Sequence, residues 1–447
     1  MSFITAKIGD ICRIEKGKTG IQKAIAGRYP LVVTGEDRKS HNEFQFDDEA
    51  VIIPLVSGTG HGHASIKRLH FQKGKFALGS ILCAVIPIDK GQLSAEYLFR
   101  YLDLNRENEL VARMRGMANV TLPIKEIAQI EIPLPTLEEQ NQFVEKFKRL
   151  EIISTTLSSE LTNQLSLVKN LRQQLLQDAV QGKLVAQDRN DEPANELLRR
   201  IKAEKEKLIK DKKIKREKEL PPIKTDEIPF ELPIGWTWCR LGEICSKIGS
   251  GSTPKGSNYS AEGIPFFRSQ NIHDDGLVYE DIKYITAATH QQMEGTIVYA
   301  NDILLNITGG SLGRCALVPN NFKEGNVSQH VCIVRPLKAN NSYFHKLFCS
   351  PLIQKLIFSS TTGAGREGLP KYNLEQFLIP LPPLSEQDRI LDKLNKLMQN
   401  SDSLMGHIKE SLSQNEKLLQ QVLRESLQTD IEEVASTKTP AMEEQRV

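Results

Sequence analysis

Apolar residues recur at alternating spacings of four and three positions along two stretches of the chain. One series starts at Phe143 and the other at Ile390, and a period of 3.5 sustained over several heptads predicts a long helix that packs against another helix. The first helix is expected over 137–181, with Gly182 as its C-terminal cap. The positions expected at the interface between the helices are Phe143, Phe147, Leu150, Leu157, Leu161, Val168, Leu171, Ile390, Leu394, Leu397, Leu404, Ile408 and Leu418.

A repeated motif precedes both predicted helices. The sequence IPLPTLEEQ begins at Ile132 and IPLPPLSEQ begins at Ile379, an offset of 247 residues (379 − 132) that also relates LRQQLL (171–176) to LLQQVL (418–423). The prolines indicate the end of a strand because they cannot donate a ladder hydrogen bond. Two helices with the same apolar stripe leave it in water unless they bury each other, so the repeat predicts an antiparallel pair.

Fainter repeats extend the duplication to whole domains. KIGDIC (7–12) resembles RLGEIC (240–245), and GMANVTLP (116–123) resembles GAGREGLP (363–370), while short apolar runs between Gly and Pro are typical of strands. The predicted fold is α+β, with two similar mixed α/β domains separated by two long helices that form an antiparallel coiled coil with pseudo-twofold symmetry. The expected boundaries are 1–131 for the first domain, 132–225 for the first helix and a charged helical linker, 226–378 for the second domain, 379–428 for the second helix and 429–447 for a disordered tail.

The linker between the first helix and the second domain is strongly basic. From Arg199 to Lys218 it has eleven Lys or Arg and four Asp or Glu, a local charge of +7. Such a run is typical of a solvated, mobile helix, and it is also compatible with contact to phosphates. The sequence leaves both interpretations open.

Composition limits the class of protein but does not give its function. A length of 447 residues indicates more than one domain, and we find no apolar run of membrane-spanning length and no leader sequence. We therefore expect a cytoplasmic protein. Its seven cysteines are scattered, which favours reduced thiols over a disulfide framework or zinc cluster, and its net charge of +2 gives no general argument for nucleic-acid binding.

Catalytic motifs are tested and rejected one by one. EKGKTG (15–20) lacks the first glycine of a phosphate-binding loop, because Cys12 stands at that position. HGH (61–63) has no third ligand at a useful spacing for a metal. Neither a G-x-S-x-G elbow, nor a dinucleotide-binding glycine motif, nor the loop of adenine methyltransferases is present. We expect no catalytic residue, no metal site and no cofactor in this chain.

Taken together, these stretches resemble the specificity subunit of type I restriction-modification systems. The resemblance rests on the two IPLPxLxEQ motifs, the segment 175–209, EIPFELPIGWTWCRLGEI (227–244), GIPFFRSQNI (263–272) and GGSLGRCALVP (309–319), and it covers about Lys7 to Leu427. It implies a DNA-binding subunit that neither cuts nor methylates DNA. Each recognition domain would bind one half of an asymmetric bipartite target, and the helix pair would set the gap between the halves.

The same resemblance implies partner subunits. Two methyltransferase subunits would dock on the helix pair, and two endonuclease subunits could join them, so that adenine methylation and ATP-dependent cleavage belong to the partners. Bases are recognised by planar donors and amides, and phosphates by Lys and small polar groups. The DNA-binding candidates with this chemistry are Arg38, Lys39, His61, His63, Lys67, Arg68, Lys255, Arg268, Gln270, Asn271, Arg314, Arg366 and Lys371.

Two other functions compete with this interpretation. In an assembly adaptor the helix pair binds other proteins and the domains never contact DNA, which predicts no salt-dependent DNA affinity. A nuclease with an unrecognised active site predicts metal-dependent turnover, but the chain shows no recognisable cluster of carboxylates.

Overall fold

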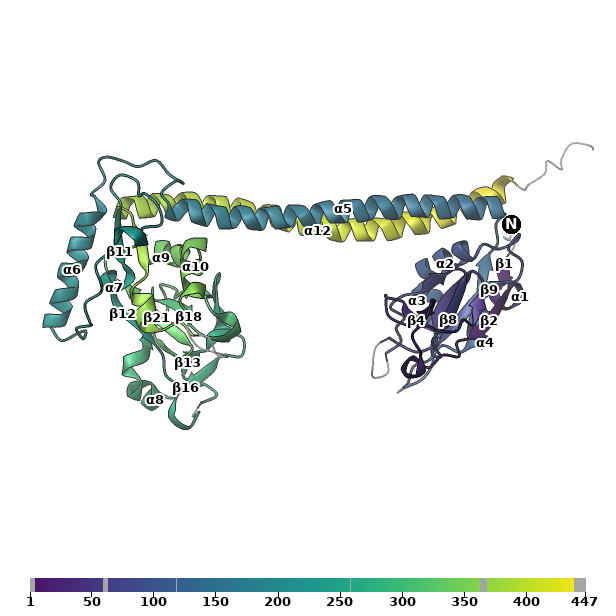
Figure 1. The fold of residues 1–447 in the computed structure, drawn as a ribbon, viewed down its shortest axis with the longest axis horizontal. Coiled ribbons are helices and arrows are strands. Elements are labelled where there is room, and N and C mark those ends of the chain that lie inside the picture. Colours follow the sequence, from purple (N-terminus) through teal and green to yellow (C-terminus); the bar gives the residue numbers. More distant parts are fainter. Residues whose placement is uncertain (1–4, 59–62, 118, 258, 362–367, 438–447) are drawn as a thin grey trace, which may run out of the picture. The chain divides into compact units, whose positions relative to one another are not determined.

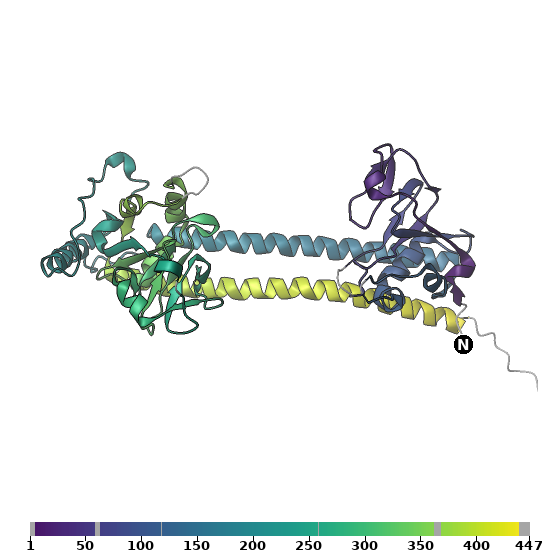
Figure 2. The same ribbon diagram turned by 90° about the horizontal axis from the view of Figure 1, so that it is seen from below.

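The computed structural model describes residues 5–58, 63–117, 119–257, 259–361 and 368–437. These residues form two compact units, each made of one domain and parts of the two long helices (Figures 1 and 2). The first unit contains Met1–Thr162 and Lys409–Val447, and the second contains Asn163–Ile408. No helix of the described residues combines the length and apolar composition needed to cross a membrane.

The N-terminal domain contains two four-stranded sheets and one two-stranded sheet. The sheet β2-β9-β6-β7 is antiparallel, whereas the sheet β4-β3-β8-β5 contains one parallel pair, β3 with β8. Strands β1 and β10 form the small sheet at the domain's junction with the first long helix. The elements are β1 (Thr5–Lys7), α1 (Ile8–Ile11), β2 (Cys12–Lys16), η1 (Ile21–Lys23), β3 (Tyr29–Val32), β4 (Lys39–His41), β5 (Phe46–Asp47), β6 (Ala50–Pro54), β7 (His70–Gln72), β8 (Lys75–Leu78), β9 (Leu82–Pro87), α2 (Ala95–Leu104), α3 (Arg106–Glu109), η2 (Val111–Arg113), α4 (Ile124–Ala128) and β10 (Glu131–Pro133).

The C-terminal domain repeats this topology. Its sheets are β12-β21-β18-β19, β16-β13-β20-β17 with β13 and β20 parallel, β11-β22, and an additional hairpin β14-β15. The duplication predicted from the sequence is therefore confirmed strand by strand. The elements are η3 (Thr225–Glu227), β11 (Thr237–Arg240), α7 (Leu241–Ile244), β12 (Cys245–Ser250), η4 (Lys255–Ser257), β13 (Ile264–Phe267), η5 (Ser269–Asn271), β14 (Ile272–His273), β15 (Gly276–Leu277), β16 (Lys283–Ile285), α8 (Ala287–Gln292), η6 (Glu294–Thr296), β17 (Ile297–Val298), β18 (Ile303–Asn306), η7 (Gly309–Ser311), β19 (Cys315–Leu317), β20 (Gly325–Val327), β21 (Val331–Pro336), α9 (Asn341–Phe348), α10 (Pro351–Ser359), α11 (Lys371–Glu375) and β22 (Leu378–Leu381).

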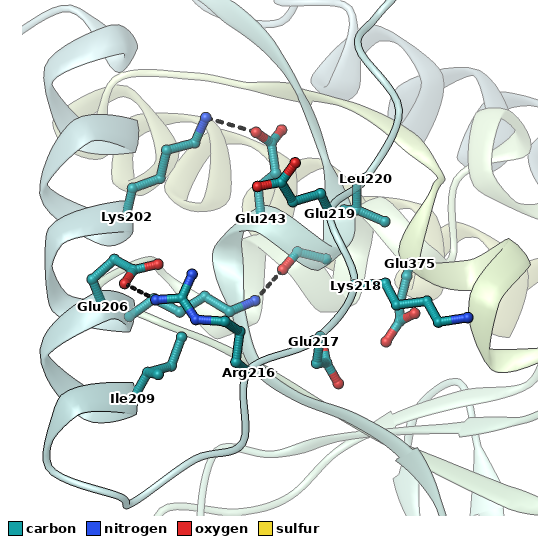
Figure 3. Close-up of a pocket in the computed structure, with 12 residues that line it drawn as sticks. Lys202, Glu206, Ile209, Arg216, Glu217, Lys218, Glu219, Leu220, Glu243 and Glu375 are labelled. Atoms are coloured by element: carbon teal, nitrogen blue, oxygen red, sulfur yellow. Dashed lines mark hydrogen bonds and ion pairs between the residues drawn. The ribbon is translucent and has the colours of Figure 1, made fainter.

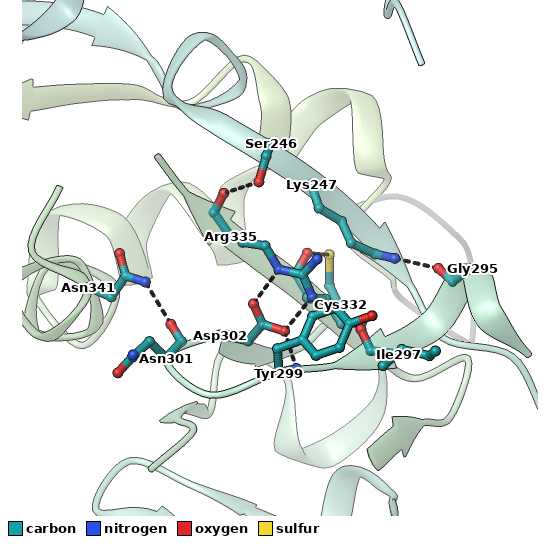
Figure 4. Close-up of polar contacts among 11 residues, drawn as sticks. Ser246, Lys247, Gly295, Ile297, Tyr299, Asn301, Asp302, Cys332, Arg335 and Asn341 are labelled. Atoms are coloured by element: carbon teal, nitrogen blue, oxygen red, sulfur yellow. Dashed lines mark hydrogen bonds and ion pairs between the residues drawn. The ribbon is translucent and has the colours of Figure 1, made fainter. Parts of the chain in front are cut away.

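A buried ion pair supports the C-terminal domain (Figure 4). Asp302 is 1% exposed and receives two bonds from Arg335, at 2.6 Å from Nε and 2.7 Å from Nη2. The same Nη2 donates to the carbonyl of Ile297, and the guanidinium lies 4.7 Å from the ring centre of Tyr299. This network joins β21 to the segment between β17 and β18.

The repeated motif fastens each long helix to its own domain through a buried glutamine. Gln140 accepts a hydrogen bond from the main-chain N–H of Ser94, the N-cap of α2, at 2.8 Å. In the second copy, Gln387 accepts from the N–H of Asn340, the N-cap of α9, at 3.0 Å. Both glutamines are fully buried, so each amide fixes the angle between a helix and a domain.

The two long helices are α5 (Leu137–Val180) and α12 (Leu384–Thr437), and they pack antiparallel. In the first unit Asn415 donates to the carbonyl of Ser154 and to Ser158 Oγ, both at 2.9 Å. In the second unit Arg172 of α5 pairs with Asp402 of α12. Residue numbers rise along one helix as they fall along the other, which confirms the predicted orientation.

The ends of the helices agree with the sequence at one place and differ at another. Gly182, just beyond α5, has a φ of +68°, the left-handed conformation expected of a C-terminal cap. Helix α12 continues to Thr437, past the expected end at 428, so the helix includes residues that were predicted to be disordered. The rest of the predicted tail, 438–447, lies outside the described residues.

The burial along the helices has the predicted period but a shifted phase. Buried positions recur every seven residues, at Ser154, Leu161 and Val168 of α5 and at Ser401, Ile408 and Asn415 of α12. The half-buried residues lie four positions after these, not three. Four predicted interface residues are consequently 44% to 59% exposed: Leu157, Leu171, Leu404 and Leu418. Leu150 and Leu397 are half-buried, and the remaining predicted positions are buried.

Polar contacts between the helices account for this phase. Ser158 and Arg172 stand at the position four residues after a buried one, and both contact α12, through Asn415 and Asp402 respectively. These bonds turn that side of α5 toward its partner and turn the side carrying Leu157 and Leu171 toward solvent. The prediction of those two leucines as interface residues is therefore wrong, and so is that of their counterparts Leu404 and Leu418.

Candidate nucleic-acid interface

Four loops of the C-terminal domain meet at one edge of its sheets. Asn306, at the end of β18, donates to the carbonyl of Ser269 at 2.8 Å and to Ser311 Oγ at 3.1 Å. The neighbouring N–H of Ile307 donates to the carbonyl of His330, and that of Gly251 donates to Val331. The loops around 251–257, 269–273, 307–314 and 328–330 are therefore fixed together, and we call them the C-terminal loop cluster.

The residues of RSQN (268–271) that were predicted to contact DNA differ in burial within the C-terminal loop cluster. Asn271 is fully buried and donates to the carbonyls of Val278 and Glu280, at 3.0 and 3.2 Å. Its Oδ1 accepts from the N–H of Arg268. Asn271 thus belongs to the framework, against its prediction as a DNA contact. Gln270 is exposed, whereas Arg268 is half-buried with Nη2 bonded to the carbonyl of Asp281 at 2.8 Å.

Arg314 lies in a groove within the second unit. This groove, of about 680 Å³, is lined from the domain side by His273, Arg314 and Lys346 and from the helix side by Arg172 and Asp402. Arg314 is exposed, and the structure places it beside two further basic side chains that the sequence had not suggested as a group. Asp274, Asp275 and Asp402 line the same groove, so its charges are mixed and the clustering alone does not select an anion.

Lys255 and Lys371 have different surroundings. Lys255 is exposed on η4, in the glycine- and serine-rich loop that follows β12. Lys371 lies at the start of α11 and pairs with Glu217 at 2.6 Å and Glu375 at 3.1 Å. Since two carboxylates occupy its ammonium group, the structure favours a framework role for Lys371 over the predicted DNA contact.

The charged linker is a docked helix, not a solvated one (Figure 3). Helix α6 (Ala194–Lys210) buries Ala194, Leu197 and Ile201 in the core of the second unit. Lys202 pairs with Glu243 of α7 at 2.6 Å, and Lys205 donates to the carbonyl of Gly242 at 2.6 Å. The interpretation of this segment as a mobile linker is therefore wrong for 194–210, because its apolar stripe finds a partner surface.

In the N-terminal domain, two arginines gather around a buried histidine. Arg38 donates from Nη1 to His70 Nδ1 and from Nε to Gln72 Oε1, both at 3.1 Å. Burial, followed by the positive charges of Arg38 and Arg68, lowers the pKa of His70 to about 4. The histidine is thus neutral at pH 7, which leaves its Nδ1 free to accept from the guanidinium. Arg68 pairs with Glu36 at 2.8 Å, and this contact lowers the pKa of the Glu36 carboxyl.

The other predicted contacts of this domain lie on its surface. Lys39 is exposed on β4, and His63 and Lys67 are exposed in the segment before β7. Arg38 and Arg68 are brought together beside His70, whereas these other three residues are exposed. His61 and, in the C-terminal domain, Arg366 lie outside the described residues.

Both domains present these loops on one backbone scaffold. In the N-terminal domain the N–H of Leu122 donates to the carbonyl of Leu55 at 2.9 Å, and in the C-terminal domain the N–H of Leu369 donates to that of Ile307 at 2.8 Å. Isolated bridges follow at the equivalent places, Val56 with Thr121 and Thr308 with Gly368. The same scaffold therefore carries different side chains in its two copies.

One polar pair of the loop cluster was missed by the sequence analysis. Thr308 Oγ1 and His330 Nδ1 are 2.7 Å apart, and His330 is exposed at the turn between β20 and β21. These two residues are 22 positions apart in the chain, so only the pairing of β18 with β21 brings them together. Thr308 directly follows the largely apolar stretch 303–307 and His330 directly precedes the apolar run 331–334, and these positions were the available signal.

Comparisons with known proteins agree with the duplicated architecture. The family model described as the type I restriction modification DNA specificity domain matches residues 3–167 and 233–414. The chain is 36% identical over 290 residues to the EcoAI specificity subunit of Escherichia coli, covering 63% of this chain and 48% of that protein. It is 47% identical over 125 residues to the EcoEI subunit, covering 28% and 21%, and 25% identical over 447 residues to the EcoDI subunit, covering 96% and 88%. The match thus covers about half of the EcoAI subunit and about a fifth of the EcoEI subunit.

Two solved structures share the fold over nearly the whole chain. The HsdS subunit from Thermoanaerobacter tengcongensis has a TM-score of 0.53 at 18% identity, covering 96% of this chain and 97% of that one. A structure reported on complex assembly and conformational transition of the type I R-M system has a TM-score of 0.56 at 18% identity, covering 95% and 97%. At this identity the likeness concerns the fold alone.

Proposed function

We propose a function from one premise: this chain belongs to the family of type I restriction modification DNA specificity domains. We infer that it is the DNA-recognition subunit of such a system, and that each of its domains binds one half of a bipartite target. The observation that carries this proposal is the repeated scaffold with different side chains. A loop cluster with Arg314 and His330 in one copy, and the Arg38–Arg68 group in the other, would select two different half-targets.

The helix pair has two roles in this proposal. Along the chain α5 leads from one domain to the next, so the length of the paired helices would set the number of base pairs between the half-targets. The second role is docking. Leu157 and Leu404 are equivalent positions of the repeat, as are Leu171 and Leu418, and all four are exposed. The repeat therefore offers the same apolar positions twice, which supports two methyltransferase subunits for each copy of this chain.

We further propose that the chain is not itself an enzyme. Methyl transfer to adenine would belong to the methyltransferase subunits, and ATP-dependent cleavage would belong to endonuclease subunits that join the complex. The chain would then need no cofactor or metal of its own, and it would act in the cytoplasm, where the DNA and the partners are. The rival function of a pure assembly adaptor shares the docking role but lacks the recognition of DNA.

The test is to co-express the chain with its methyltransferase subunit and to map methylated adenines across the host genome. We expect a single asymmetric motif of two half-targets with a fixed gap. Replacing residues 1–131 with the corresponding domain of a relative should change one half only. A stable complex with an active methyltransferase but no sequence motif would overturn the proposal and leave an assembly adaptor.

A further inference from the structure

The basic residues of the linker region differ in their pairing from one end of the segment to the other. The basic residues of the first part of α6 are paired: Arg199 with Glu196, Arg200 with Glu192 and Lys202 with Glu243. By contrast, five lysines at and beyond the end of α6 are exposed, and no side-chain hydrogen bond or ion pair of theirs occurs among the described residues. We call them the lysine tip: Lys207, Lys210, Lys212, Lys213 and Lys215.

Several acidic residues nearby line a cavity together with Lys202, Lys205, Arg216 and Lys218. This cavity of about 550 Å³ lies between α6 and the chain that returns from it, and its walls include Glu206, Glu217 and Glu243 (Figure 3). None of the five lysines lines this cavity. The hydrogen bond from Lys338 is the main cause of the lowered pKa of Glu204, and the charges of Lys207 and Lys213 lower it by a smaller amount. Residues 207–215 contain five lysines and one acid, Asp211, and so carry a charge of +4 (5 − 1).

Helix stabilisation does not account for this charge. Lysines in the last turn of a helix interact favourably with its dipole, but the effect disappears within that turn. Helix α6 ends at Lys210, and Lys212, Lys213 and Lys215 lie beyond it. Like charges this close repel each other, which disfavours the compact state. An anion bound to the tip would remove this repulsion.

The lysine tip is also held in place at both ends. On its N-terminal side, Lys205 is bonded to the carbonyl of Gly242. On its C-terminal side, Arg216 pairs with Glu206 at 2.6 Å and Glu217 pairs with Lys371. Further along, the buried Arg240 donates to the carbonyls of Pro221 and Pro222, both at 3.3 Å. A surface fixed in this way loses less conformational entropy when it binds than a free linker does.

We propose that the lysine tip binds the phosphate backbone of duplex DNA that flanks the half-target of the C-terminal domain. This inference rests on the proposed DNA-recognition function and adds a contact that carries no sequence information. Lysine acts as a point charge toward phosphate, and each phosphate that is neutralised releases counterions. The tip would add affinity and salt dependence without changing the motif.

The test compares two variants of the whole chain in complex with its methyltransferase. One replaces all five lysines with glutamine, and the matched control replaces them with arginine, which keeps the charge. Affinity is measured against salt concentration on a target duplex extended by about 20 base pairs, or two helical turns, beyond the C-terminal half-target, and on a duplex trimmed at that point. Methylated adenines are mapped for each variant.

The glutamine variant should bind the extended duplex more weakly than the wild type, and most so at low salt, with a salt slope reduced by about 0.9 for each lost phosphate contact and by about 4.5 for all five. The arginine variant should behave as the wild type, the trimmed duplex should show little difference, and the methylated motif should stay the same in all three proteins. An unchanged slope for the glutamine variant overturns the proposal, and weaker binding of the methyltransferase instead would assign the tip to a protein partner. Failure of the recognition function would appear separately, as the loss of any motif in the wild type.

Discussion

Neighbouring residues 270 and 271 allow a sharp test of which polar side chains build the C-terminal loop cluster and which are free to contact bases. Asn271 makes three hydrogen bonds in a fully buried position, two donated and one accepted. Each bond contributes about 1 kcal/mol, and a buried group left without a partner costs about 1 to 3 kcal/mol. We therefore expect Asn271→Ala to reduce the free energy of unfolding of the C-terminal domain by about 3 kcal/mol.

The adjacent Gln270 provides the matched control. It is exposed, and exposed substitutions change stability by about 0.5 kcal/mol or less. Gln270→Ala should therefore leave the stability unchanged, whereas Asn271→Asp should be worse than Asn271→Ala. The aspartate turns an acceptor toward the carbonyls of Val278 and Glu280, where the wild-type amide donates.

The assay can report on one domain because the chain has two tryptophans, Trp236 and Trp238, and both lie in the second unit. Urea unfolding followed by tryptophan fluorescence should show a midpoint lower by about 1 to 2 M for Asn271→Ala. The methylated motif of the complex, mapped at low temperature where the variant is folded, should match the wild type. A variant of wild-type stability, or one with a new motif, would refute the assignment of Asn271 to the framework.

Three further outcomes are expected. Arg335→Met leaves the Asp302 carboxylate buried without its cation and should lower the free energy of unfolding by about 3 kcal/mol in the same assay. Arg335→Lys should recover only part of this loss because lysine cannot form the bidentate pair. Equal stability of the wild type and both variants would contradict this account. Duplicating one heptad in each helix, 158–164 in α5 and 408–414 in α12, adds about 10.5 Å of helix and should lengthen the gap of the methylated motif by about three base pairs of 3.4 Å, whereas duplication in one helix alone should abolish the motif. The Arg389 side chain lowers the pKa of Asp191 below its ordinary 3.8, so the pair stabilises the fold above pH 3.8 and its contribution is lost as pH falls through the lowered pKa. Asp191→Asn should lower the urea midpoint at pH 7, and the difference from the wild type should shrink as pH falls below 3.8.

The sequence allowed the duplication, the strand exits and the helix period to be predicted, because each of these depends on local chemistry. Prolines at the ends of β10 and β22 end those strands, and a seven-residue apolar repeat sets the helix period, and both effects depend only on residues nearby in the sequence. The phase of the seam depends on which residues the partner helix presents. Asn415 and Asp402 bring Ser158 and Arg172 inward, a choice that no periodicity in α5 alone could reveal.

For the candidate nucleic-acid interface, the sequence predicted the types of residue present but not which of them are free to contact DNA. Asn271 and Gln270 look equally suitable for contact with bases, but the carbonyls that occupy Asn271 come from the turn before β16 and were not foreseeable from spacing. Likewise, the charge of the linker was evident from composition. The pairs of Arg199 and Arg200 are local, but the pairing of Lys202 with Glu243 of α7 and of Glu217 with Lys371 of α11 joins segments that are distant in sequence.

The two buried glutamines have a consequence for how such a protein can change over generations. Gln140 and Gln387 make the same kind of bond, to the main-chain N–H at the start of a domain helix. A main-chain group is present whatever the side chain, so the connection makes few demands on the sequence of the domain it holds. A foreign domain with the same backbone at that point could be inserted by recombination without altering the helices. New combinations of half-targets could therefore arise from existing domains, because the same glutamine-to-main-chain hydrogen bond would attach each domain to its helix.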